Sequence, residues 1–184
     1  MARDQSLAAL RRFGFLTLDN YSMIAVSNAI EGLRMANRLG QGDAYVWDIL
    51  TLNGEAARAS NGLCLHPTLQ ATGQRYDIIF VCGGVNVRAA TSEALRSFLR
   101  TQARAGSMLG ALCTGTFALA EAGLLRGYRC AVHWENLSAI QEESPELYVS
   151  CDLFFLARNR LTCSGASVPL YLLPNFLEAC SCPS

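Results

Sequence analysis

Short apolar runs alternate with longer segments of helical periodicity along the chain. Residues 13–18 (FGFLTL) suit a buried strand, and residues 22–39 repeat apolar side chains every three or four positions, which indicates a helix. The same patterns predict further strands at 45–52, 76–82, 107–112 and 128–134, and further helices at 91–106, 115–125 and 134–144. This β-α alternation predicts a mostly parallel sheet with helices on both faces.

Three segments depart from this alternation. Residues 55–67 suggest edge strands or a hairpin around the turn signal Asn61-Gly62, and residues 147–165 suggest two or three short strands. The apolar segment after residue 167 contains Pro169 and Pro174, which we expect to break a helix there. No repeat or linker divides the 184 residues, so a single domain is expected.

Composition narrows the class of protein. Hydrophobic residues make up 51% of the chain, but no run approaches the roughly 18 apolar residues of a membrane span. The first twelve residues lack the apolar core of a signal peptide, so a cytoplasmic location without a membrane partner is expected. Fifteen basic and fifteen acidic residues give a net charge of +0, and no basic footprint indicates that this chain binds nucleic acid by itself.

The eight cysteines and two histidines do not form a metal-binding pattern. No C-x-x-C pair occurs, and neither His66 nor His133 has a zinc-type spacing to the cysteines, so we predict no metal and no cofactor. Most of the cysteines are expected to be reduced, buried and structural. Cys113 is the exception because of the residues around it.

The stretch GALCTGTF (110–117) ends an apolar run at Cys113 and continues with small residues. We predict a sharp turn between a strand and a helix, with the thiol at its apex. The following amides and the helix N-terminus favour a thiolate, and they equally favour a bound carboxylate. His133, at the end of the next predicted strand, is a candidate base for catalysis, or else a strand-end histidine bonded to backbone.

Four segments together resemble a known family: residues 14–39, YDIIFVCGG (76–84), GALCTGTFALAEAGLLRGYRCAVHWENL (110–137) and LTCSGA (161–166). They are similar to the N-terminal sensor domain of AraC/XylS-type transcriptional regulators, within the class I glutamine amidotransferase-like (PfpI-type) superfamily. The resemblance covers residues 12–167 and implies a flavodoxin-like, three-layer α/β sandwich. It also implies a domain that senses a small molecule, an amino-acid or quaternary-ammonium metabolite such as betaine, carnitine or arginine, and that forms a homodimer.

The chain departs from these relatives outside that range. Residues 1–11 are a lead, and residues 168–184 are an atypical tail in which Tyr171 stands where relatives have an aspartate. The helix-turn-helix domain of such regulators is absent from the sequence, so DNA binding is expected only through that missing domain. The first helix and the edge strands near 55–65 are the candidate dimer surfaces.

The residues around Cys113 also differ from those of the enzymes in the superfamily. PfpI-type proteases have a histidine directly after the cysteine, where this chain has Thr114, and many hydrolase or glyoxalase relatives have a glutamate after the first strand, where this chain has Asp19-Asn20-Tyr21-Ser22. We therefore expect no enzyme activity. The alternative is a cysteine-dependent hydrolase or glyoxalase-like enzyme that uses Cys113 and His133.

The sensor interpretation assigns the same region to ligand binding. Backbone amides at Gly83–Gly84 and Thr114–Gly115 would hold a carboxylate, and Glu135 or Glu31 would add negative charge. An aromatic ring of Trp134, Tyr21 or Phe117 would face a cationic head, although core packing is the alternative for Trp134 and Phe117. The predicted ligand-binding set is Gly83, Gly84, Cys113, Thr114, Gly115, His133, Trp134, Glu135 and Tyr21.

Overall fold

A central sheet of seven strands organises the protein. The computed structural model describes residues 10–165 and 167–173, and orders these strands β3-β2-β1-β4-β5-β9-β8. All neighbours run parallel except β8, which pairs antiparallel with β9 at one edge. The strands are β1 (Arg12–Thr17), β2 (Val46–Thr51), β3 (Leu69–Gln70), β4 (Ile78–Cys82), β5 (Met108–Leu112), β8 (Phe154–Ala157) and β9 (Arg160–Cys163).

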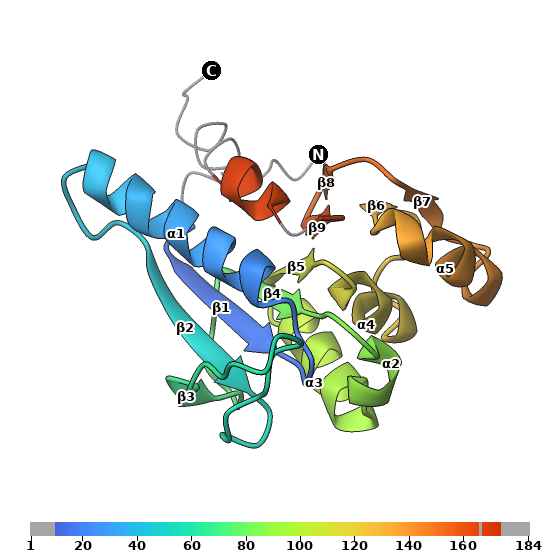
Figure 1. The fold of residues 1–184 in the computed structure, drawn as a ribbon, viewed down its shortest axis with the longest axis horizontal. Coiled ribbons are helices and arrows are strands. Elements are labelled where there is room, and N and C mark those ends of the chain that lie inside the picture. The colour runs from blue at the N-terminus through green and yellow to red at the C-terminus, as the bar shows by residue number, and fades with distance from the viewer. Residues whose placement is uncertain (1–9, 166, 174–184) are drawn as a thin grey trace.

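Helices cover both faces of this sheet, as Figure 1 shows. Apolar residues of α1 (Met23–Leu39) and of a short helix at 168–173 share one core with Phe13, Phe15 and Phe80 of the strands. Apolar residues of α3 (Glu93–Arg104) and α4 (Gly115–Glu121) share a second core with the strand residues that point the other way. The predicted three-layer α/β sandwich with a mostly parallel sheet is therefore confirmed.

The side-chain alternation in the strands explains the two cores. Phe13 and Phe15 in β1 point toward α1, while Leu16 points toward the α3 face. The Phe15 ring stacks on the Phe80 ring of the neighbouring strand, with 5.6 Å between centroids. Phe13, Phe15 and Leu16 are fully buried, so β1 is covered on both faces, as a central parallel strand should be.

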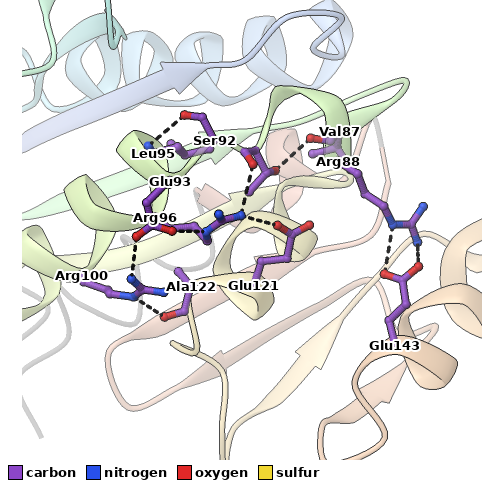
Figure 2. A network of polar contacts seen from close by, with 11 residues as sticks. Val87, Arg88, Ser92, Glu93, Leu95, Arg96, Arg100, Glu121, Ala122 and Glu143 are labelled. Atoms are coloured by element: carbon purple, nitrogen blue, oxygen red, sulfur yellow. Dashed lines mark hydrogen bonds and ion pairs between the residues drawn. The ribbon is translucent and has the colours of Figure 1, made fainter.

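An arginine cluster ties the two helices on the second face together. Arg96 of α3 lies between Glu93 and Glu121, with N–O distances of 2.9 and 3.1 Å, and Arg100 of α3 donates to the carbonyl of Ala122 after α4 (Figure 2). α3 begins at an N-cap, Ser92, whose hydroxyl accepts from a backbone N–H of the first turn. The predicted helix at 91–106 is thus present two residues shorter at each end.

The predicted strand at 128–134 does not join the central sheet. Its ordered part, β6 (Arg129–Ala131), pairs with β7 (Tyr148–Ser150) in a separate two-stranded sheet. The inference that His133 ends a strand of the main sheet is therefore wrong. Side chains attach β6 to the rest: the Ala131 N–H donates to the Thr162 hydroxyl at 2.8 Å, and the Ala131 carbonyl accepts from Thr116.

Two other expectations need correction. Residues 55–67 contain only isolated bridges, including one between Arg58 and Cys64, and the edge strand is β3, which follows that segment. Residues 168–173 are helical although Pro169 lies among them, because a proline in the first turn removes an N–H that has no partner in the helix anyway. Pro174 lies outside the described residues.

The remaining elements are short and lie after β4 and β6. A four-residue helix, α2 (Val87–Ala90), follows β4 and was not predicted. A 3₁₀ turn, η2 (Trp134–Asn136), leads directly into α5 (Leu137–Glu143), which confirms the helix expected at 134–144. Across residues 10–165 and 167–173, no helix is both long and apolar enough to cross a membrane.

Candidate functional site

The turn after β5 has the geometry of a nucleophile elbow. Cys113 follows β5 directly and has a φ of 56°, a left-handed conformation that is uncommon for residues other than glycine. α4 begins two residues later at Gly115. A Cβ atom on Gly115 would lie 2.1 Å from the carbonyl oxygen of Val81 in β4, so the turn packs backbone against backbone. The predicted sharp turn with the thiol at its apex is confirmed.

The electrostatic surroundings of Cys113 oppose ionisation of its thiol. Burial raises the pKa of Cys113 above its ordinary value, and the nearby carboxylate of Glu135 raises it further. A hydrogen bond from the Thr114 N–H lowers the pKa without offsetting burial. The expectation of a favoured thiolate is therefore wrong, because removing the thiol from water raises its pKa more than the Thr114 N–H lowers it.

His133 lies on the segment that faces the elbow, but it is paired with another residue. Its Nδ1 atom is 3.5 Å from Oε2 of Glu135, and its ring centroid is 5.7 Å from the ring of Trp134. Within the described residues, no hydrogen bond joins His133 to Cys113. The two residues of the enzyme alternative are thus not coupled as a thiol and its base.

Trp134 is one of the most exposed large apolar side chains. It is 69% exposed, so the core-packing alternative for this residue is wrong. It sits in η2 between His133 and Glu135, where a ligand or another protein can reach its ring.

The two glycines after β4 serve close packing more than anion binding. The Gly83 N–H donates to the Leu112 carbonyl at 3.2 Å and extends the pairing of β4 with β5. This amide was predicted to hold a ligand carboxylate, but its hydrogen bond to Leu112 leaves it no free donor. The Gly84 carbonyl accepts from the Thr114 hydroxyl at 2.7 Å, and a Cβ on Gly84 would lie 2.0 Å from the carbonyl oxygen of Asn20. The glycines let three loops meet above the sheet.

The other two aromatic candidates are buried. Tyr21 is fully buried, and its hydroxyl accepts from the Leu65 N–H at 3.2 Å, which anchors the 57–65 segment to the strand ends. The Phe117 ring is 2% exposed, and the guanidinium carbon of Arg88 lies 4.6 Å from its centroid. The cation over Phe117 is therefore the protein's own. Glu31 is paired with Arg34 on the surface of α1.

A cavity of about 410 Å³ lies beside the elbow, between α2 and α4. It contains two residues of the predicted set, Gly84 and Thr114, and its full lining is Gly84, Asn86, Val87, Arg88, Ala89, Thr114, Phe117 and Asn136. The sequence reasoning missed the other polar members of this lining, Asn86, Arg88 and Asn136. The signal for Asn86 and Arg88 was the segment VNVRAA (85–90), which follows the Gly-Gly end of β4, the place where ligands bind in open α/β sheets.

A second cavity, of about 530 Å³, lies at the ends of β1 and β2. Asp19 and Glu55 give its lining a negative charge, and no arginine or histidine contributes to it. The Thr51 hydroxyl, also in this lining, is buried and has no hydrogen-bond partner among the described residues. The described residues contain no group of three or more His, Cys, Asp or Glu side chains that could hold a metal ion.

The fold and the elbow agree with the comparisons with known proteins. The profile of the DJ-1/PfpI family matches residues 21–177. The chain belongs to the DJ-1/PfpI family. Within this family, its similar curated relatives include two HTH-type transcriptional regulators of Pseudomonas aeruginosa. GbdR is 45% identical over 87% of this chain and 44% of its own length, and CdhR is 37% identical over 88% and 48%.

A solved structure supports the same assignment. An AraC family transcriptional regulator from Pseudomonas putida superposes with a TM-score of 0.79 and is 27% identical, covering 92% of this chain and 97% of that one. The resemblance to AraC-type regulators within the PfpI-type superfamily is therefore confirmed. This DJ-1/PfpI chain spans less than half the length of GbdR and CdhR.

Proposed function

We propose that this DJ-1/PfpI domain is the ligand-sensing and dimerising part of an AraC-type transcriptional regulator. The observation that carries the proposal is its 45% identity to the regulator GbdR over 87% of the chain, in a match that leaves more than half of GbdR outside it. DNA would be bound by a helix-turn-helix domain, which is not part of this sequence. The net charge of +0 agrees with a domain that does not bind DNA directly.

The site supports sensing over catalysis. A cysteine nucleophile needs a lowered pKa and a base in hydrogen-bond reach, whereas burial and Glu135 raise the pKa of Cys113. His133 is paired with Glu135 instead. The elbow geometry alone would favour a cysteine-dependent hydrolase or glyoxalase-like enzyme. In such an enzyme, Cys113→Ala should abolish turnover. The sensor predicts no turnover in either form.

The ligand class we propose is an amino-acid or quaternary-ammonium metabolite, with betaine, carnitine and arginine as representatives. Each of these molecules combines a carboxylate with a positive charge. The cavity beside the elbow holds a guanidinium, that of Arg88, and the Asn86 and Asn136 side chains, which form no hydrogen bond to another described residue. Glu135 and the exposed ring of Trp134 are neighbours of that cavity through Asn136 and offer groups that suit a cationic head.

Calorimetric titration of the chain tests this proposal. Glycine betaine, carnitine and arginine are titrated in turn, and thermal unfolding with each ligand is recorded in parallel. At least one should release or absorb heat and raise the melting temperature, since a ligand at 100 times its Kd stabilises the folded state by about 2.7 kcal/mol. Absence of heat and of stabilisation with all three would refute the proposed ligand class. A cytoplasmic homodimer is part of the proposal, and analytical ultracentrifugation checks the dimer.

A further inference from the structure

Arg88 and Glu143 form an ion pair at the rim of the cavity beside the elbow. The Nε atom of Arg88 lies 3.0 Å from Oε2 of Glu143, and Nη2 lies 2.5 Å from Oε1, so the guanidinium holds the carboxylate through two nitrogens (Figure 2). This is the two-point geometry that arginine uses for carboxylates in general. Arg88 lines the cavity, and Glu143 comes from the end of α5.

The guanidinium of Arg88 is positioned independently of Glu143. It stacks 4.6 Å from the centroid of the Phe117 ring, and Phe117 is a buried residue of α4. Stacking on an aromatic face orients the planar fork of an arginine without using its N–H donors. The N–H donors of Arg88 can therefore bind either the Glu143 carboxylate or the carboxylate of a ligand.

We propose that Arg88 binds the carboxylate of the sensed metabolite, and that Glu143 occupies this place when no ligand is present. The inference rests on the proposed sensing function and names its recognition residue. Ligand binding exchanges one carboxylate for another on Arg88, and it frees Glu143. Because carboxylate is the group that betaine, carnitine and arginine share with a glutamate side chain, a single guanidinium serves all three.

The exchange would also change a contact between two elements of the fold. Among the described residues, the Arg88–Glu143 pair is the one ion pair or side-chain hydrogen bond that connects α2 with α5. α5 packs against η2 and β7, and β7 pairs with β6 in the small sheet beside the main one. Loss of this pair on ligand binding therefore releases α5 from α2 and changes how that small sheet is held.

The exposure of the pair makes such an exchange feasible. The side chains of Arg88 and Glu143 are 47% and 49% exposed, and ion pairs in contact with water contribute little to stability. A buried pair would resist opening far more strongly. An identical degree of exposure occurs in the Arg34–Glu31 pair on α1, which lies outside the cavity lining and supplies a matched control.

Matched ligands test the role of the carboxylate. Choline is glycine betaine with the carboxylate reduced to an alcohol, and agmatine is arginine without its carboxylate. Calorimetry with each pair should show binding of the carboxylate-bearing member and at least a tenfold weaker affinity for the other. Equal affinity of choline and betaine, or of agmatine and arginine, would overturn the assignment of a carboxylate contact.

Matched variants test the two residues. Arg88→Gln should weaken binding of the active ligand at least tenfold, and Arg88→Lys, which keeps the charge but loses the two-point geometry, should weaken it less. Glu143→Gln should bind the ligand several-fold more tightly, because the competing carboxylate is gone. A purely structural Glu143 predicts unchanged or weaker binding, so the sign of this effect separates the two roles. Arg34→Gln should leave affinity unchanged.

The outcomes separate the inference from the proposed function. A wild-type chain that binds no ligand removes both. If the wild-type chain binds a ligand and Arg88→Gln binds it with the same affinity as the wild type, the sensing function stands and the role of Arg88 is overturned. Unchanged or weaker binding in Glu143→Gln overturns the competition between Glu143 and the ligand. Melting temperatures of all variants within the range of Arg34→Gln show that the comparison is made between folded proteins.

Discussion

Replacing Gly115 by alanine should destabilise the protein, because the elbow and β4 touch through their backbones. The new Cβ would lie 2.1 Å from the Val81 carbonyl oxygen, whereas ordinary contacts are 3.4–4 Å. The start of α4 or the end of β4 must therefore move by at least about 1 Å. Val81 belongs to a fully buried central strand, and no flexible side chain can absorb that movement.

The size of the effect follows from two opposing contributions. Forcing an extra carbon into a packed interior costs about 1–3 kcal/mol, and a backbone obstacle places Gly115→Ala at the upper end, about 3 kcal/mol. Alanine in place of glycine in a helix returns up to about 1 kcal/mol. The net loss of about 2 kcal/mol should lower the melting temperature by about 4–8 °C for a chain of this size.

Thermal unfolding followed by circular dichroism measures this difference. Gly42→Ala is the control, because a Cβ there meets nothing within 4 Å and its φ is not positive. The control should melt at or slightly above the wild-type temperature, since alanine restricts the unfolded chain. A melting temperature of Gly115→Ala within about 2 °C of the control, which corresponds to less than 1 kcal/mol, would refute the backbone contact as the reason for this glycine.

Three further predictions concern single groups. Cys113 should react slowly with iodoacetamide at neutral pH, and Glu135→Gln should speed the reaction because removing that carboxylate lowers the pKa of the thiol. Mass spectrometry follows both alkylation rates, and fast alkylation of the wild-type protein would contradict the reasoning. Tyr21→Phe should lower the free energy of unfolding in urea by about 1–3 kcal/mol, since the Leu65 N–H loses its acceptor. Burial raises the pKa of Tyr76 to about 12 from 10.0, so its contribution to stability is complete below pH 10.0 and is lost as the pH rises through about 12. Urea unfolding at stepped alkaline pH should show this loss, and Tyr76→Phe should show less of it.

The order of strands and helices could be predicted because burial leaves a local trace in the sequence. β1 and β4 are buried on both faces and read as continuous apolar runs, and α3 carries an N-cap at its start. The partner of a strand leaves no such trace. Cys130 and Ala131 of β6 are fully buried, as residues of a central strand would be, yet β6 pairs only with β7 in the separate sheet. Burial pattern alone could not separate these cases.

The position of the elbow could be predicted from the sequence, but the contacts that its residues make could not. A glycine after a strand suits both an anion-binding amide and a close approach of two backbones, and only the distances decide between them. At Gly83 the amide bonds to Leu112, and the missing Cβ makes room for the Gly115 nitrogen. Arg88 was missed because an arginine in a short helix has the same sequence pattern as a solvated side chain. Only its pairing with Glu143 in the structure distinguishes it.

Cys113 combines two features that suit the proposed sensor. The residue keeps the left-handed backbone of an elbow, with a φ of 56°, while burial and Glu135 hold its thiol neutral. A thiolate at this position would repel the carboxylate of a metabolite bound in the adjoining cavity, since like charges in a partly buried site destabilise one another strongly. A neutral thiol leaves the guanidinium of Arg88 as the charged group in the lining of that cavity. The raised pKa of Cys113 therefore agrees with the carboxylate-bearing ligand that we propose.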